Sequence, residues 1–173
     1  MYTSNETLKT IFNRKSIRSF IDKPIPKEII NVLLRAGMAA PSAKNRQLWE
    51  FFLIDDKNIL KDLSEKLPHA KMLVQTPAAI MICGDTEDKY ESGFWDQDCS
   101  AATENILLAA ESLSLGAVWI GIYPREDRVK IIQDIFKLPK NIVPLNVVPV
   151  GYPNEDPELI NKWNPSKLHH NIW

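Results

Sequence analysis

Four apolar segments of strand length, separated by segments with helical periodicity, constrain the fold of this chain more than any other feature. We expect strands over residues 50–55, 78–84, 117–122 and 143–150. The run over 78–84 (AAIMICG) is continuously apolar, which is typical of a strand that is covered on both faces. Strands that alternate with helices favour a layered domain in which helices pack on both faces of the sheet.

Helices are expected where apolar residues recur at helical spacing. The pattern over 27–39 stops at Pro41, because proline cannot continue a helix. The pattern over 94–115 is the longest and is rich in alanine and leucine, so we expect this helix to lie centrally. The remaining helices are expected over residues 5–13, 57–67, 69–75 and 126–136.

Composition excludes several classes of protein. A length of 173 residues predicts a single domain over residues 1–173. The formal net charge of -1 and the pI near 6.3 argue against a nucleic-acid partner. No apolar run approaches the roughly 20 residues that cross a bilayer, and residues 1–9 are too polar for a signal peptide, so no membrane partner is expected. A local basic patch would therefore serve a small molecule.

Neither the cysteines nor the histidines show the spacing of a metal site. Cys83 and Cys99 form no CxxC pair, and we expect reduced structural thiols in a cytoplasmic protein, although the two could still meet in space. His69 has no partner at ligand spacing, and the adjacent His169 and His170 would diverge in an extended chain. The sequence predicts no metal.

Acidic residues cluster at the long helix over 94–115. Asp96, Asp98 and Glu104 precede or enter this helix, where negative charge complements the positive helix N-terminus. That role is sufficient to explain them.

The last stretch, residues 151–173, differs in kind from the rest of the chain. It contains three prolines and two tryptophans, Trp163 and Trp173. We expect an extended C-terminal arm that packs either on its own domain or on a second subunit, because free tails rarely keep two tryptophans in water.

Three cations and a serine lie within five residues of each other at positions 14–18 (RKSIR). Guanidinium groups beside a hydroxyl suit an anion with several acceptor oxygens, above all a phosphate. In an extended segment, alternation would place Arg14, Ser16 and Arg18 on one face and Lys15 and Ile17 on the other. A solvated basic face is the simpler interpretation of such a cluster taken alone.

Two further segments have the composition of a binding site. The loop over 40–47 (APSAKNRQ) offers small residues and amide side chains that both donate and accept, as a planar heterocycle requires, but it also fits a plain helix-to-strand connection. Gly121, near the end of the expected strand over 117–122, would either allow close approach of a ligand to the backbone or mark a bulge.

The familiar glycine-rich nucleotide motifs are missing from the sequence. There is no GxGxxG and no GxxxxGK[ST], and the chain has 6 glycines in all. Phosphate binding would therefore depend on side chains, which fits the cluster over 14–18.

Taken together and in order, five segments closely resemble the FMN-dependent nitroreductase family. They are residues 14–18 (RKSIR), 40–49 (APSAKNRQLW), 98–110 (DCSAATENILLAA), 115–121 (LGAVWIG) and 162–169 (KWNPSKLH). The resemblance implies an α+β fold, a three-layer α/β/α sandwich with a mainly antiparallel or mixed central sheet. It also implies a homodimer that exchanges C-terminal arms and holds FMN at the subunit interface.

The reaction implied by the resemblance is a ping-pong transfer of a hydride from NAD(P)H, through flavin N5, to a small acceptor such as a nitroaromatic or a quinone. Arg14 and Ser16 would bind the ribityl phosphate with help from Lys162, and Arg18 would tune the flavin electrostatically. No catalytic residue beyond the flavin is implied.

The ring end of the implied site comes from two other segments. Pro41, Ser42 and Asn45 of the other subunit would border the isoalloxazine, and Gly121 or Ile122 would offer an amide to N5. The full set of cofactor-binding residues that the resemblance implies is Arg14, Lys15, Ser16, Arg18, Pro41, Ser42, Ala43, Asn45, Gln47, Trp119, Ile120, Gly121 and Lys162.

The chain also departs from the family pattern. Leu48 stands where the family often has proline, Lys162 stands where arginine is common, and the inserted helices of longer members are missing. Relatives that fragment flavin or dehalogenate their substrates share the fold, so these reactions remain open. A storage module is a further alternative, in which a side chain such as Trp95 or Tyr123 would cover the flavin face.

Overall fold

The computed structural model describes residues 5–87 and 92–173. One antiparallel sheet forms its centre, with β1 (Trp49–Ile54), β2 (Ala78–Asp85) and β5 (Ile142–Gly151) side by side in that order. Two short strands, β3 (Gly116–Ala117) and β4 (Ile120–Gly121), pair with β5 at the other edge. The expected sheet is confirmed.

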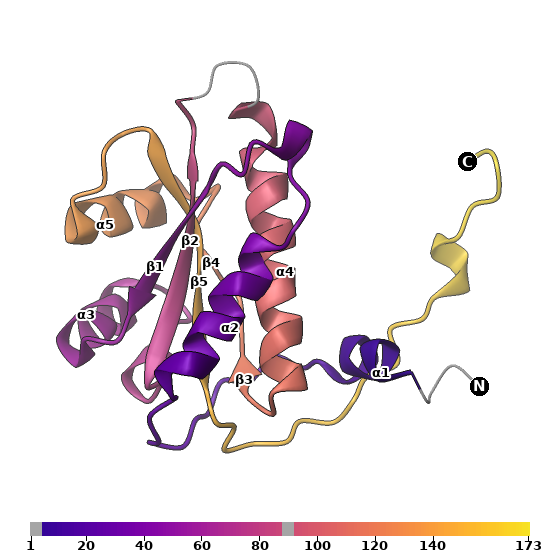
Figure 1. Ribbon diagram of the computed structural model, residues 1–173, viewed down its shortest axis with the longest axis horizontal. Helices are drawn as coiled ribbons and strands as arrows, with labels where there is room; N and C mark the ends of the chain where they lie inside the picture. The colour runs from indigo at the N-terminus through magenta and orange to yellow at the C-terminus, as the bar shows by residue number, and fades with distance from the viewer. Residues whose placement is uncertain (1–4, 88–91) are drawn as a thin grey trace.

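Helices cover both faces of this sheet, as expected from the sequence (Figure 1). On one face lie α2 (Lys27–Met38) and α4 (Trp95–Ser112), and on the other lie α3 (Lys57–Lys66) and α5 (Glu126–Phe136). A short α1 (Glu6–Asn13) lies outside the layers, beside the C-terminal arm. The result is an α+β sandwich of three layers.

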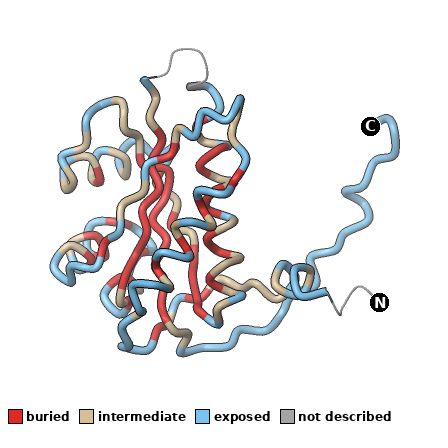
Figure 2. Tube along the Cα trace, in the orientation of Figure 1, coloured by how far each residue is buried: buried red, intermediate tan, exposed pale blue. Residues whose placement is uncertain are grey.

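The alternation of side chains along each strand divides the core in two. In β2, Ile80 and Ile82 pack in the cluster beneath α2 and α4, whereas Met81 and Cys83 pack in the cluster beneath α3 and α5. Successive side chains of a strand point to opposite faces, so a strand that is covered twice must be apolar throughout. Figure 2 shows the buried residues concentrated in the sheet and in α4.

The strand expected over 117–122 is present as two pieces in one register. Gly116 pairs with Gly151 and Ala117 with Val150, and after the interruption at residues 118 and 119 the pairs Ile120–Val147 and Gly121–Asn146 continue the same register. These pieces are therefore one interrupted edge strand.

Several predicted helix boundaries were wrong. The helix expected over 94–115 ends at Ser112, because Ser114 adopts φ 57° and the Leu115 amide bonds the Ala110 carbonyl at 2.8 Å. This is the geometry of a Schellman ending, in which a left-handed residue stops the helix. The helix expected over 69–75 is a 3-10 turn, Lys71–Val74.

The first helix also begins later than expected. Asn5, expected as its first residue, is instead the N-cap of α1, and its side chain accepts a hydrogen bond from the Leu8 amide. The N-cap residue stands outside the helical φ/ψ region, so the first turn starts one residue further on.

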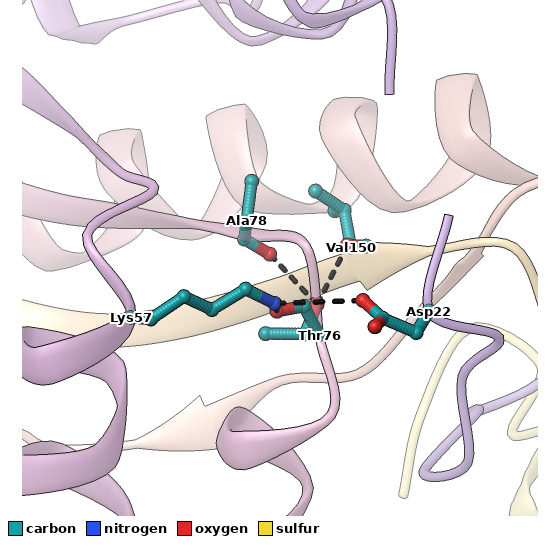
Figure 3. Close-up of polar contacts among 5 residues, drawn as sticks. All are labelled: Asp22, Lys57, Thr76, Ala78 and Val150. Carbon is teal, nitrogen blue, oxygen red and sulfur yellow. Dashed lines mark hydrogen bonds and ion pairs between the residues drawn. The ribbon is translucent and has the colours of Figure 1, made fainter. Parts of the chain in front are cut away.

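One buried threonine joins the two central strands (Figure 3). The Thr76 hydroxyl lies 2.9 Å from the Ala78 carbonyl oxygen and 2.7 Å from that of Val150. The Lys57 ammonium donates to the Thr76 carbonyl at 3.2 Å and lies 3.8 Å from the Asp22 carboxylate. This network fixes the start of α3 against the adjoining ends of β2 and β5.

The chain leaves the sandwich after β5 as an exposed arm (Figures 1 and 2). It contains one 3-10 turn, Pro165–Lys167, and extends past α1. Among the described helices none has the length and apolar character needed to span a membrane.

Candidate flavin-phosphate groove

A large cavity lies between the basic segment over 14–18 and the C-terminal arm. Its volume is about 810 Å³. Its walls come from the end of α1, from the basic segment and from residues 157–163 of the arm. Four of the predicted cofactor residues from the basic segment, Arg14, Lys15, Ser16 and Arg18, line it together with Lys162. Segments from the two ends of the chain thus meet in one groove.

The basic segment is held in place by the sheet edge. The Ile17 amide donates to the Ala117 carbonyl at 3.0 Å, and Ser16 forms an isolated parallel bridge with Ala117. The Ile17 side chain is 5% exposed and lies against Gly116, where a Cβ atom would come within 2.6 Å of Ile17 Cγ2. Glycine at position 116 therefore lets the segment approach β3 this closely.

The orientation of the basic segment agrees with alternation except at Lys15. Ile17 points into the protein, while Arg14, Ser16 and Arg18 line the groove. Lys15 lines the groove too, although strict alternation would place it beside Ile17, because its ammonium forms an ion pair with Asp156 of the arm.

The groove carries the donors that a phosphate monoester needs. Arg14 Nε lies 3.8 Å from Glu104 Oε1, and Arg18 Nη1 lies 3.5 Å from the Ser16 carbonyl, so each guanidinium retains donors that these contacts do not use. Two guanidinium groups, an ammonium and a hydroxyl match an anion with several acceptor oxygens. The residues present therefore fit a phosphate group.

The loop over 40–47 lies apart from this groove. Pro41, Ser42, Ala43, Asn45 and Gln47 are not among the described residues that line it. Within one chain, the structure therefore separates the two parts of the predicted site.

The loop nevertheless has a defined and strained shape. Lys44, Asn45 and Gln47 all adopt positive φ, between 48° and 57°. The Gln47 amide donates to Ser42 Oγ at 3.0 Å, which closes the turn. Non-glycine residues in this region are uncommon and gather at functional sites.

The two amides predicted to reach the flavin differ in their hydrogen bonding within the sheet. The Ile122 amide donates to the Leu145 carbonyl at 3.0 Å, so it is already used. Hydrogen-bonded pairs alternate along an antiparallel ladder, so the amide and carbonyl of Gly121 point away from β5. The Gly121 carbonyl accepts from Arg128 Nη1 at 2.8 Å on that side.

Trp119, Ile120 and Gly121 are not among the described residues that line the groove, but they belong to the edge strand on which the basic segment docks. Gly121 continues the strand register of Ala117, the residue to which the basic segment docks. At about 3.3 Å per residue the two positions are roughly 13 Å apart. Trp119 is half-buried and Ile120 is buried between them. This spacing suits an elongated ligand with a phosphate at one end.

No metal centre is formed by the residues that the structure describes. Cys83 and Cys99 are free and buried, and the Cys99 thiol donates to the Cys83 carbonyl at 3.4 Å. Burial raises the pKa of the Cys83 thiol to about 12, with a smaller effect from Glu50, and burial raises the pKa of Cys99 as well. Both thiols are protonated at neutral pH and are unsuited to nucleophilic chemistry.

Sequence reasoning missed the role of three acidic residues. Asp98 does more than complement a helix end: it is 5% exposed, and its Oδ1 accepts the Ala43 amide of the predicted loop at 3.0 Å. Glu155 and Asp156, at the start of the arm, contact the basic segment. No sequence signal marks these contacts, because the partners are far apart in the chain.

Comparison with known proteins identifies the family of the chain. The family model described as Nitroreductase family matches residues 11–152. A protein of Archaeoglobus fulgidus, provisionally named NADH dehydrogenase/NAD(P)H nitroreductase, is 44% identical over 172 residues, which cover 97% of this chain and 99% of that protein.

Two solved structures extend the comparison to the fold. One, from Parabacteroides distasonis and with the same provisional name, is 50% identical with a TM-score of 0.95, and the match covers 98% of this chain and 100% of that one. An FMN-dependent nitroreductase from Clostridium difficile is 30% identical with a TM-score of 0.89, over 96% and 99% of the two chains. Sequence and fold agree over nearly the full length, and the chain belongs to the nitroreductase family.

Proposed function

We propose that this protein is an FMN-dependent oxidoreductase that transfers a hydride from NAD(P)H to a small-molecule acceptor. One observation carries the proposal: Arg14, Ser16, Arg18 and Lys162 line a single groove between the basic segment and the C-terminal arm. The names of the relatives support it, since one is an FMN-dependent nitroreductase and another is named for NADH and NAD(P)H.

The chain's own residues bind and orient the cofactor. Arg14 and Ser16 hold the ribityl phosphate and Lys162 adds a charge from the arm. The Gly121 amide, which points away from β5, donates toward the ring at the other end of the site. Arg18 lines the same groove, and its positive charge favours negative charge on the bound flavin. When bound, FMN supplies the redox chemistry, taking up a hydride from NAD(P)H and passing the electrons to an acceptor such as a nitroaromatic or a quinone in a ping-pong sequence.

The complete site requires two copies of the chain. Pro41, Ser42, Ala43, Asn45 and Gln47 lie away from the groove in one chain, so we assign them to the site of a second subunit. The exposed apolar side chains of the arm support a homodimer, because in a lone chain Trp163 is 71% and Trp173 is 99% exposed. The cytoplasmic location stays a prediction.

Anaerobic stopped-flow spectroscopy of the FMN-loaded protein tests the proposed reaction. Loss of flavin absorbance on mixing with NADH or NADPH, followed by recovery on adding a nitroaromatic or a quinone at the rate of turnover, is the expected result. Flavin that binds and is not reduced by either nucleotide would instead identify a storage module.

The phosphate contact gives a prediction of its own. Arg14→Ala should weaken FMN binding by about 1.5–3 kcal/mol, the usual effect of losing a hydrogen bond to a charged group. Riboflavin, which has no phosphate, should bind wild type and variant equally. Fluorescence titration with both ligands measures these affinities. Equal FMN affinities in the two proteins would show that Arg14 does not bind the phosphate.

A further inference from the structure

The beginning of the arm, residues 152–156, lies antiparallel to residues 18–21, at the end of the basic segment. The Ile21 amide donates to the Tyr152 carbonyl at 2.9 Å, and the Asn154 amide donates to the Ser19 carbonyl at 2.9 Å. Between these contacts Phe20 forms a bridge with Pro153. We call residues 152–156 the arm root. It is attached to its own domain, unlike the exposed remainder of the arm.

Two carboxylates of the arm root complete this attachment. Glu155 Oε1 accepts hydrogen bonds from the Arg18 amide and, at 3.2 Å, from the Ser19 amide. Asp156 forms an ion pair with the Lys15 ammonium. Two of the three partners, Lys15 and Arg18, line the groove, and they lie close in the chain to Ile17, which docks on the sheet edge.

The charge of these carboxylates opposes the function proposed for the groove. A negative group close to a phosphate site weakens binding of an anion by Coulomb repulsion. Two carboxylates beside the groove therefore lower its affinity for phosphate unless they also stabilise the structure that binds it. The contacts of Glu155 indicate this stabilisation, because its oxygen joins two successive backbone amides and so limits the conformations of Arg18 and Ser19.

We propose that Glu155 is a positioning residue for the phosphate-binding segment. By bonding the amides of Arg18 and Ser19, it holds the backbone in the conformation in which Arg14, Ser16 and Arg18 all line the groove. Glu155 lies beyond the stretch that the family model matches and outside the five segments that resemble the family. The inference rests on the proposed binding of FMN.

A comparison of two substitutions separates the positioning role from the effect of charge. Glu155→Ala removes both the charge and the acceptor, whereas Glu155→Gln removes the charge and keeps an acceptor oxygen of the same reach. We expect Glu155→Ala to weaken FMN binding about three- to tenfold, in line with the loss of a modest hydrogen bond. Glu155→Gln should bind FMN as tightly as wild type or more tightly, since it keeps the contact and loses the repulsion.

Riboflavin titrations and a remote control complete the experiment. Riboflavin affinity should be the same in wild type and in both variants, because positioning acts on the phosphate end. Glu65→Ala is the matched control, since Glu65 is an exposed glutamate of α3, on the opposite side of the sheet from α4. It should leave both affinities unchanged.

The outcomes distinguish this inference from the proposed function. If wild type binds FMN no more tightly than riboflavin, the proposal that this groove binds the FMN phosphate is wrong. A second outcome is that wild type prefers FMN while the alanine and glutamine variants both bind FMN more tightly than wild type, and to the same extent. In that case Glu155 acts only through its charge, and the positioning role is overturned. A parallel loss of riboflavin affinity in Glu155→Ala would likewise overturn it, since that result indicates general loosening of the site.

Discussion

At the residue scale, the contact between Ile17 and Gly116 determines where the basic segment lies. A Cβ atom at position 116 would lie 2.6, 2.7 and 2.9 Å from three atoms of the Ile17 side chain, Cβ among them. The atoms closest to the backbone are involved, so a change of rotamer would not relieve the overlap. The position of Arg14, Ser16 and Arg18 in the groove therefore depends on the missing side chain of Gly116.

Gly116→Ala should destabilise the protein and weaken FMN binding together. Overpacking of a close contact usually costs about 1–3 kcal/mol in unfolding free energy. Urea denaturation measures this change, and FMN titration measures the displacement of the basic segment. Gly93→Ala is the control, because a Cβ at position 93 meets nothing within 4 Å. A Gly116→Ala protein as stable as the control would contradict the close packing seen here.

At the element scale, α4 joins the parts of the candidate site. Asp98 in its first turn bonds the Ala43 amide of the loop over 40–47, and Asn105 donates to the Ala36 carbonyl of α2 at 3.0 Å. Glu104, between them, lies 3.8 Å from Arg14 of the basic segment. One rigid helix thus sets the distance between the loop and the basic segment.

Asp98→Ala should loosen the loop that α4 holds. The Ala43 amide would lose its acceptor in a partly buried place, which costs about 1–3 kcal/mol of stability. Asp96→Ala is the matched control, because Asp96 lies in the same first turn and has the same effect on the helix terminus. Hydrogen exchange of residues 40–47 should accelerate in the Asp98 variant and stay unchanged in the control. Equal exchange in both would show that Asp98 acts only on the helix end.

At the scale of the whole molecule, the arm divides into an attached root and an exposed remainder. Six large apolar residues beyond the root are more than half exposed, namely Leu159, Ile160, Trp163, Leu168, Ile172 and Trp173. Apolar side chains at this density mark a surface that is covered by a partner. The proposed homodimer provides such a cover.

Truncation can test the two parts of the arm separately. A chain that ends at Asp156 keeps the root and loses the apolar remainder, whereas one that ends at Tyr152 loses both. We expect both truncations to be monomers by light scattering and to lose FMN on dialysis. The shorter chain should also have a lower thermal midpoint, because residues 18–21 lose the contacts of Pro153, Asn154 and Glu155. A stable yellow dimer of either truncated chain would rule out an interface built by the arm.

The local pattern of residues was sufficient to predict most elements. The continuous apolar run over β2 and the helical periods around it predicted a sheet covered on both faces, and the helix over Glu126–Phe136 was located to the residue. Boundaries were missed where a single backbone conformation ended an element, as at Ser114, because a positive φ in a non-glycine residue leaves no mark in the sequence.

The candidate site shows the same division between local and distant information. The order of five motifs identified the family from the chain alone, and the cation spacing at 14–18 predicted the residues that line the groove. The proximity of Lys162 to Arg14, the use of the Ile122 amide by Leu145 and the contacts of Asp98 and Glu155 came from the folded structure. Periodicity reports which face of an element is apolar, but contacts between distant segments depend on how all the elements pack at once.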